Sequence, residues 1–305
     1  EALASTPGLE HPIVAMPDVH FKARNPAPTG IVLATRDRLV PFAVDKGINC
    51  GMRMVTSELP ASACTGRMLD ALYGELQRQV PIQPPHAPVL RRRDVRRALA
   101  EGARWACEHF ELADSERDAI ERRGSMFEGR DVDPDEILAA LPEVAVKKAR
   151  RAFGTLGGGN HFLEAQEIVE ILDTEKAALL GLQKGRVLFM MHTGSGAVGS
   201  LMMRFYSTHG RLAYRRERLA FEAGKLRFHL RHARPSPPEL RQLWNFMAAD
   251  RRFFTLAADS HQGRRFVRAL YAAANFGFVN RIAITEALRD AVRTTFAAPE
   301  LRLPL

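Results

Sequence analysis

The sequence predicts a mixed α/β fold, α+β in its arrangement, that forms one compact domain over residues 1–305. Short apolar runs bounded by glycine and proline lie within residues 12–60 and 154–200, and such runs are typical of strands. Between them, the charged residues 86–152 predict a helical insertion. Candidate site residues come from both ends of the chain, so these regions have to meet in one domain.

In the N-terminal half, residues 30–34 and 39–44 are the predicted strands. A proline-rich loop at 83–88 precedes the helical insertion. Within the insertion, Ser115 is a candidate N-cap followed by acidic residues, and Asp133 before a proline indicates another helix start.

In the C-terminal half, the apolar residues 187–191 predict a buried strand. Residues 200–234 predict a helix and a strand, and the prolines within 235–238 predict a break. Residues 239–248 and 263–297 predict two further helices, the second unusually long. The chain has no internal repeat and no low-complexity segment.

Charge and cysteine content narrow the class of protein. There are 44 lysines and arginines against 35 acidic residues, and the resulting net charge of +9 suits a polyanionic partner. Three cysteines, an odd number, argue against a disulfide framework, and Cys64 and Cys107 are expected to be small buried side chains. No apolar run of about 18 residues and no signal-peptide pattern occurs. We therefore expect a cytoplasmic protein without membrane association.

Basic residues occur in short runs, most of which predict solvated helix faces. The run within 147–151 differs because it leads directly into a glycine-rich turn, where it could steer RNA through phosphate contacts. The other runs are 91–93, 96–97, 215–216, 251–252 and 264–265.

The glycine-rich segment 154–164 carries the strongest functional signal. Its glycines let backbone N–H groups approach phosphate oxygens closely, because no Cβ intervenes. Asn160, His161 and Glu164 follow and add an amide, an imidazole and a carboxylate, so we expect them to line one pocket with the turn. The alternative is a tight turn entering a buried strand, with His161 in the core.

Two further segments place a metal-capable side chain beside glycines. Cys50 precedes Gly51, and His192 stands at the end of a predicted strand before a glycine-rich loop. With His161 these residues form a nitrogen and sulfur ligand set for a borderline metal such as Zn²⁺, Mn²⁺ or Fe²⁺. Single residues of these types are usually structural, but three in matching contexts favour a metal site.

Five motifs follow one another along nearly the whole chain, from about Pro12 to Glu286. They are Met16-Pro17-Asp18-Val19-His20, Ile48-Asn49-Cys50-Gly51, Gly154 through Glu164, His192-Thr193-Gly194-Ser195, and Ala272-Ala273-Ala274-Asn275-Phe276 through Asn280-Arg281. In order and spacing they resemble the signatures of the RtcB RNA ligases. The helical region before the glycine turn also resembles that family.

The resemblance implies an RNA ligase that depends on Mn²⁺ and GTP. Such enzymes join RNA ends carrying a 3′-phosphate or 2′,3′-cyclic phosphate to 5′-hydroxyl ends, in RNA repair or tRNA splicing. A histidine is first guanylylated, and the 3′-phosphate is then activated as an RNA–GMP anhydride. The matched positions are Cys50, His161 and His192 for the first Mn²⁺, and Asn160 and Glu164 for guanylate. The backbone N–H groups of Gly158 and Gly159 are expected to hold phosphate oxygens. Asp18 and His20 are candidates for hydrogen bonds to the ligand histidines, with a structural residue at a strand end as the alternative for His20.

This chain departs from the family pattern at the second metal site. The family's aspartate, three residues before the cysteine, falls on Gly47, and the nearest carboxylate is Asp45. The histidine expected after Asn-Arg falls on Glu286, an alternative oxygen ligand. The arginine after His-Thr-Gly-Ser is Gly196. We therefore expect one intact metal site and one that is lost or rebuilt from Asp45 and Glu286.

The guanylylated histidine of the family has no match among the ten histidines of this chain, so its catalytic nucleophile is unknown. We expect the C-terminal part of the family to be absent from these residues. Three hypotheses remain open: an RNA ligase, a one-metal paralogue that binds RNA ends or nucleotide without joining them, and an enzyme that opens cyclic phosphates.

Overall fold

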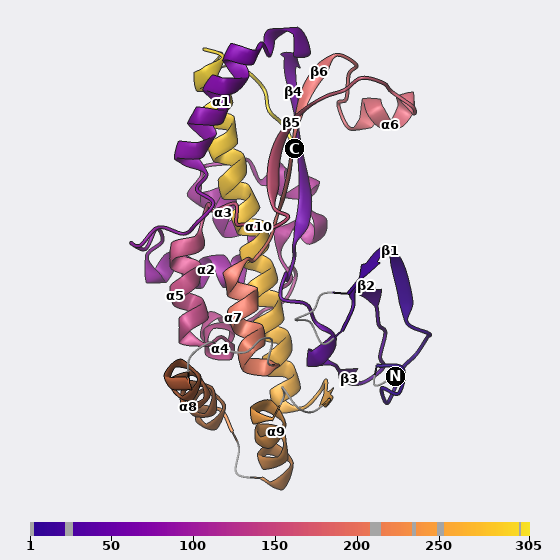
Figure 1. Ribbon diagram of the computed structural model, residues 1–305, viewed down its shortest axis with the longest axis vertical. Helices are drawn as coiled ribbons and strands as arrows, with labels where there is room; N and C mark the ends of the chain where they lie inside the picture. Colours follow the sequence, from indigo (N-terminus) through magenta and orange to yellow (C-terminus); the bar gives the residue numbers. More distant parts are fainter. Residues whose placement is uncertain (1–2, 22–26, 208–214, 234–235, 249–252, 299) are drawn as a thin grey trace.

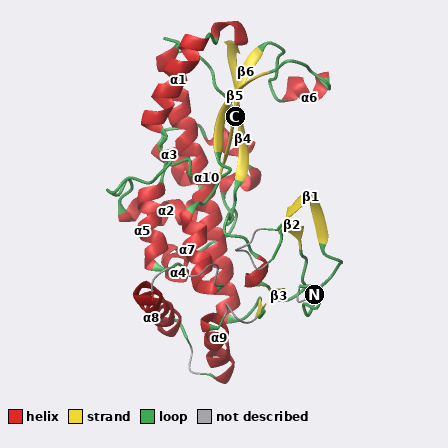
Figure 2. Ribbon diagram, viewed as in Figure 1, coloured by secondary structure: helices red, strands yellow, loops and turns green. Residues whose placement is uncertain are grey.

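The computed structural model describes residues 3–21, 27–207, 215–233, 236–248, 253–298 and 300–305. One long helix, α10 (His261–Thr295), runs along most of the molecule, and the other elements pack around it (Figures 1 and 2). A three-stranded sheet lies beside its C-terminal part, and shorter helices surround its N-terminal part. A separate hairpin lies to one side with the N-terminus. The predicted mixed α/β fold is confirmed.

The remaining helices are α1 (Gly66–Gln79), α2 (Arg92–Glu101), α3 (Ala103–His109), α4 (Pro134–Ala140), α5 (Glu143–Ala152), α6 (Thr174–Leu179), α7 (Ala197–Tyr206), α8 (Arg215–Arg231) and α9 (Pro237–Met247). The strands are β1 (Val14–His20), β2 (Thr29–Val32), β3 (Arg38–Leu39), β4 (Gly51–Pro60), β5 (Phe162–Glu167), β6 (Arg186–Thr193) and β7 (Leu256–Ala257). They form the antiparallel sheets β1–β2, β3–β7 and β4–β6–β5.

The helix α10 joins two apolar cores. Its C-terminal part packs Ile284 and Leu288 against the sheet, where Val55 and Phe189 are buried. Its N-terminal part, including Phe276, packs against α2, α3, α4 and α7, and α5 packs on α7. A helix buried on most of its circumference is expected to be apolar all round, and most of α10 follows that rule.

Several predicted elements are confirmed. Residues 187–191 lie within β6, and residues 30–34 overlap β2. The insertion is helical, and Asp133 caps α4 by accepting the N–H of Asp135 at 2.8 Å. The two C-terminal helices correspond to α9 and α10.

Three local predictions are wrong. The strand at 39–44 ends at Leu39, and a 3₁₀ turn (Pro41–Ala43) follows, because Pro41 has no N–H for a strand ladder. Ser115 caps no helix, since the 3₁₀ turn Asp114–Ala119 starts without a side-chain cap. Residues 200–234 contain parts of α7 and α8 and, where described, no strand; residues 208–214 lie outside the described part.

Cys64 and Cys107 were both expected to be buried, and one of them is. Cys107 is buried, whereas Cys64 is partly exposed, and desolvation raises the pKa of both thiols. Among the described residues, no helix combines the length and apolar character needed to cross a bilayer.

His229 on α8 is a buried histidine in an aromatic cluster. It is 1% exposed, and its ring stacks on Phe246 with 4.2 Å between centroids. Nε2 lies 2.8 Å from the carbonyl oxygen of Phe205, which places the proton on Nε2. Nδ1 has no partner in the described part of the chain. Burial lowers the pKa of His229 to about 3, so the folded protein keeps this ring neutral.

We expect acid to destabilise the protein through His229. The unfolded chain takes up a proton near the ordinary pKa of 6.5, whereas the folded ring resists protonation down to about pH 3. The stability linked to this residue is therefore complete above pH 6.5 and falls below it by about 1.4 kcal/mol per pH unit.

Urea unfolding at a series of pH values measures this effect. The free energy of unfolding should fall less steeply with acid in His229→Phe than in the wild type. His86→Gln, which changes an exposed histidine, should follow the wild type. Equal slopes for all three proteins would exclude His229 as the cause.

Candidate metal centre

The register of the sheet brings Cys50, His161 and His192 to one end of it. β6 lies between β4 and β5 and is antiparallel to both, so its last residues meet their first residues. His192 pairs with Met52 on one side and with Phe162 on the other. Because Cys50 directly precedes β4 and His161 directly precedes β5, all three side chains meet at this end.

The distances suit a shared metal ion. Cys50 Sγ lies 3.1 Å from His161 Nε2 and 3.2 Å from His192 Nε2, and the three ligand atoms lie within 4.8 Å of one another. Tetrahedral coordination by a thiolate and an imidazole separates sulfur from nitrogen by roughly 3.5 Å. A shift of a few tenths of an ångström would therefore open a coordination site. The three predicted ligands lie together, while metal binding itself stays a prediction.

Both histidines are held in the neutral form that metal binding requires. Burial lowers the pKa of His161, and the backbone of Leu156 opposes it only in part. Burial, His161 and Arg281 lower the pKa of His192. His192 Nδ1 lies 3.2 Å from Met52 Sδ, and His161 Nδ1 has no hydrogen-bond partner among the described residues.

Two glycines permit the close packing of the centre. Gly157 has a φ of +93°, and a Cβ there would overlap Nδ1 of His161. A Cβ on Gly194 would lie 2.7 Å from the Cα of Cys50. Any larger residue at either position would displace a candidate ligand.

Arg281 of α10 fastens the Cys50 loop to the end of β6. Its Nη1 donates to the carbonyl oxygens of Asn49 at 2.8 Å and Thr193 at 2.9 Å, and Nη2 donates to Asn49 Oδ1 at 2.9 Å. Asn49 has a φ of +51° and donates its side-chain amide to Ala274. Burial lowers the pKa of Arg281 to about 10, against the attraction of Cys50, so the guanidinium stays charged at neutral pH.

Asn280 of the same helix fastens the glycine turn. Its Oδ1 accepts the N–H of Gly154 at 2.8 Å, and its Nδ2 donates to the carbonyl oxygen of Thr155 at 2.9 Å. Sequence reasoning missed these roles of Asn280 and Arg281. The available signal was two adjacent polar residues inside an apolar helical run.

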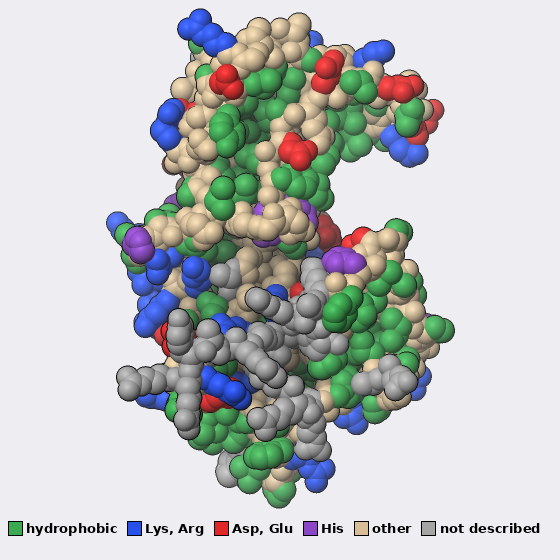
Figure 3. Space-filling view, viewed as in Figure 1, with side chains coloured by type: hydrophobic (Ala, Val, Ile, Leu, Met, Phe, Trp, Pro, Cys, Tyr) green, Lys and Arg blue, Asp and Glu red, His purple; other side chains and the backbone are tan. Residues whose placement is uncertain are grey.

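A cavity of 270 Å³ opens beside His161. Gly157, Gly158 and the loop at 194–196 line it, and Lys148 of α5 reaches it from the side. Ser195 Oγ is fully buried at its wall and has no hydrogen-bond partner among the described residues. Backbone groups, a hydroxyl and a lysine suit a small anion such as phosphate. Figure 3 shows histidine side chains near the narrow middle of the molecule.

The family described as tRNA-splicing ligase RtcB matches residues 1–305, the whole chain. The chain belongs to the RtcB family. The resemblance identified from the five motifs is therefore confirmed.

Individual RtcB relatives agree with this assignment. The chain is 30% identical over 296 residues to the RNA-splicing ligase RtcB of Mycobacterium tuberculosis, covering 94% of this chain and 60% of the relative. It is 28% identical over 304 residues to the tRNA-splicing ligase RtcB of Methanococcus maripaludis, covering 96% and 55%. For the Thermococcus kodakarensis protein of that name, identity is 27% over 297 residues, covering 96% and 54%. The chain thus spans little more than half the length of these relatives.

The residues matched to the RtcB guanylate and phosphate contacts are not gathered in one place. Gly158 lines the 270 Å³ cavity, whereas Gly159 and Asn160 are exposed on the turn. Glu164 is exposed on β5 and accepts a hydrogen bond from Gln166 at 2.8 Å. Neither Asn160 nor Glu164 lines this cavity, and their role in guanylate binding stays a prediction.

Asp18 and His20 lie on the exposed strand β1. His20 Nδ1 lies 2.6 Å from the backbone oxygen of Asp18. Among the described residues, neither side chain hydrogen-bonds to His161 or His192, so the expected support of the ligands is not seen. Met52 takes that place for His192.

Two positions that would supply ligands to the second RtcB metal are altered in this chain. Among the described residues, no carboxylate joins the cluster of Cys50, His161 and His192. A Cβ on Gly47 would lie 4.0 Å from Cys50 Sγ, so this position faces the cluster but supplies no ligand. Asp45 accepts hydrogen bonds from Thr29 and from the N–H of Lys46. Glu286 pairs with Arg289 at 2.7 Å. Neither carboxylate joins Cys50 and the histidines.

Several residues of the basic runs do not lie on solvated helix faces. Arg150 and Arg151 donate to the carbonyl oxygens of Leu90 and Pro85, which leaves Lys148 to face the cavity. Arg265 is buried with its guanidinium 4.0 Å from the ring centre of Phe228. The run at 251–252 lies outside the described residues.

We expect Gly157→Ala to lose bound metal, because the added Cβ overlaps the His161 ring at a backbone angle that alanine disfavours. Gly158→Ala is the matched control, since a Cβ there meets nothing within 4 Å. Metal content after dialysis should fall several-fold in the first variant and stay at the wild-type level in the second. Equal retention by both would show that His161 does not depend on Gly157.

Proposed function

We propose that this chain is the metal-binding part of an RtcB-type RNA ligase that acts in RNA repair or tRNA splicing in the cytoplasm. Its reaction joins a 3′-phosphate or 2′,3′-cyclic phosphate end to a 5′-hydroxyl end with Mn²⁺ and GTP. The observation that carries the proposal is the convergence of Cys50, His161 and His192 beside a polar cavity. Membership of the RtcB family and the names of the relatives support RNA as the substrate.

Each group has a separate task in this proposal. Cys50, His161 and His192 would hold the ion, which when bound neutralises phosphate charge and polarises the phosphorus. Arg281 holds the Cys50 loop and places a positive charge near the sulfur. The N–H groups of the glycine turn and Lys148 would orient a phosphate in the cavity. Gly158 and Gly159 belong to that turn.

Asn160 and Glu164 are proposed to contact guanylate. Both are exposed near the centre, where a nucleotide can reach them from solvent. Each offers a group that suits a purine or ribose: a carboxamide from Asn160 and a carboxylate from Glu164.

We propose one tight metal site and a second that is weak or missing. Position 47 points at the Cys50 sulfur and has only hydrogen to offer. Glu286 is neutralised by Arg289. With no carboxylate beside the cluster, a second hard cation would lack its preferred oxygen ligands.

Gly47 and Glu286, which weaken the second metal site, favour a second candidate function. In this function the protein binds RNA ends or nucleotide without joining them. Labelled RNA with a 3′-phosphate and a 5′-hydroxyl, incubated with Mn²⁺ and GTP, separates the candidates. A joined product supports the ligase, binding without a joined product supports the second candidate, and opening of a cyclic end without joining identifies a different phosphoryl reaction.

We expect dialysed protein to retain about one metal ion per chain, and Cys50→Ser or His192→Ala to lose it. Gly47→Asp should add a second, weaker ion, because the new carboxylate would face the sulfur. Elemental analysis by mass spectrometry measures both. Cys64→Ser, a thiol outside the cluster, should behave as the wild type. Two tight ions in the wild type would contradict the one-site proposal, and none would contradict metal binding.

Guanylate binding tests the role of Asn160 separately from metal binding. Asn160→Ala should weaken GMP binding in calorimetry by up to about tenfold, the effect of one lost hydrogen bond. Its side chain is exposed, so the fold should be unaffected. Glu167→Ala, at another exposed position near the end of β5, is the control. Unchanged affinity in a folded Asn160→Ala protein would refute the assignment.

A further inference from the structure

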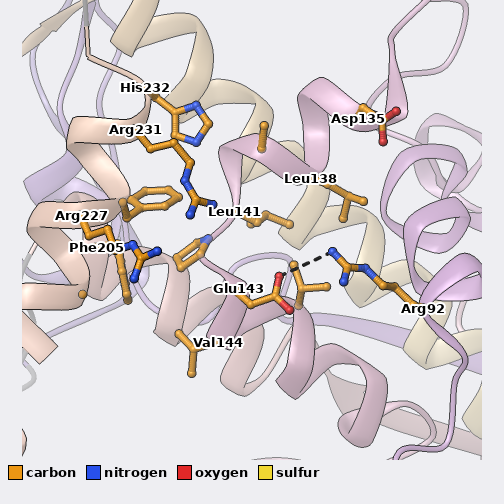
Figure 4. A pocket seen from close by; sticks show the side chains of 15 residues that line it. Arg92, Asp135, Leu138, Leu141, Glu143, Val144, Phe205, Arg227, Arg231 and His232 are labelled. Atoms are coloured by element: carbon orange, nitrogen blue, oxygen red, sulfur yellow. Dashed lines mark ion pairs between the residues drawn. The ribbon is translucent and has the colours of Figure 1, made fainter. Parts of the chain in front are cut away.

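A second cavity, of 730 Å³, lies between α8 and the start of α5, apart from the metal centre (Figure 4). Its apolar wall includes Leu138, Leu141 and Val146 from the α4–α5 region and Phe205 from α7. A volume of several hundred cubic ångströms suits a group the size of a nucleotide.

Two guanidinium groups face this cavity from α8. Arg227 and Arg231 stand one helical turn apart, and in Figure 4 both side chains reach into the same space. Both are exposed, and neither has an ion-pair partner among the described residues. Arginines without a carboxylate are suited to phosphate, which their planar guanidinium groups bind through paired hydrogen bonds.

The carboxylates at the rim are already matched by cations. Glu143 lies 4.0 Å from Arg92, which faces α8 across the cavity in Figure 4. Asp135 pairs with Arg96 at 2.8 Å. The cavity is therefore left with the positive charge of the two α8 arginines.

The helix α5 connects this cavity to the metal centre. Its first residues, Glu143 and Val144, line the 730 Å³ cavity, and its last residue, Ala152, lines the cavity beside His161 together with Lys148. Ten residues of helix span about 15 Å, a few nucleotides of an extended strand. Lys147 is exposed along the way, and Figure 3 shows Lys and Arg side chains gathered over α5 and α2.

From this arrangement we infer that the cavity between α5 and α8 binds single-stranded RNA, a few nucleotides away from the end held at the metal centre. Neighbouring phosphates contact Arg227 and Arg231, and a nucleoside contacts the apolar wall. Single-stranded RNA fits better than an acidic peptide, because a basic helix leads from this cavity to a cavity suited to phosphate. The inference rests on the proposed function in one respect: the same RNA strand occupies both places.

The test compares two RNA probes that both carry a 3′-phosphate. A dinucleotide is too short to reach from the metal centre to α8, whereas a strand of about a dozen nucleotides spans both cavities. Wild-type protein should bind the long probe more tightly. The double variant R227Q/R231Q should lose roughly tenfold in affinity for the long probe and little for the dinucleotide. The slope of log binding constant against log salt concentration should also be shallower by about one in the double variant than in the wild type.

Two further variants separate the cavity from general charge. Arg218→Gln removes an exposed arginine of the same helix that does not line the cavity, and it should bind as the wild type. Gly224→Leu places a side chain in the cavity without a change in charge, at a position where a Cβ meets nothing within 4 Å, and it should weaken only the long probe. Metal content and the unfolding midpoint should be unchanged in all variants.

The outcomes distinguish this inference from the proposed function. If the long RNA binds tightly but R227Q/R231Q and Gly224→Leu have no effect, the cavity assignment is overturned and the proposed function stands. If neither RNA binds the wild type, both fail. If polyglutamate displaces the long RNA as well as unlabelled RNA does, the surface is a general anion binder and the assignment to RNA is overturned.

Discussion

The candidate centre depends on one buried cation. Arg281 is 4% exposed, yet it donates to two carbonyl oxygens and one amide oxygen on the Cys50 loop and at the end of β6. Hydrogen bonds from a charged group contribute about 1.5–3 kcal/mol each, which offsets the cost of burying the guanidinium. The bonds hold Asn49 in a left-handed conformation and keep Cys50 facing β6. Lysine could not replace it, because a single ammonium group lacks this planar fork.

Other buried polar side chains of α10 also hydrogen-bond to backbone groups of neighbouring segments around the site. Asn275 donates to the carbonyl oxygens of Leu99 and Ala100 and accepts the N–H of Met126, all outside α10. Asn280 does the same for the glycine turn. These backbone groups lie in the last turn of α2 and in loops, where a buried amide with both donors and acceptors can satisfy them. One rigid helix thereby fixes the relative positions of segments far apart in sequence.

How far the sequence predicts this molecule depends on whether the signal is local. Cys50, His161 and His192 were recognisable because each stands beside glycines at a strand end. Their meeting also needed the antiparallel register, which no local pattern specifies. The strand expected at 39–44 failed at Pro41, where one missing N–H outweighs an apolar run. The partners of the imidazoles were unpredictable, since Met52 reaches His192 only through the pairing of β4 with β6.

The chemistry of the centre follows from what position 47 lacks. Thiolate and imidazole donors suit Zn²⁺ or Fe²⁺ at least as well as Mn²⁺, which prefers oxygen. Among the described residues, no carboxylate joins the metal cluster, so Cys50 is the one anionic ligand that the cluster contains. The nearby Arg281 reduces the negative potential at the cluster further. A hard ion would then need oxygen ligands from water or phosphate. Metal and phosphate binding should therefore be coupled more strongly here than in a centre with its own aspartate, since each supplies charge that the other requires.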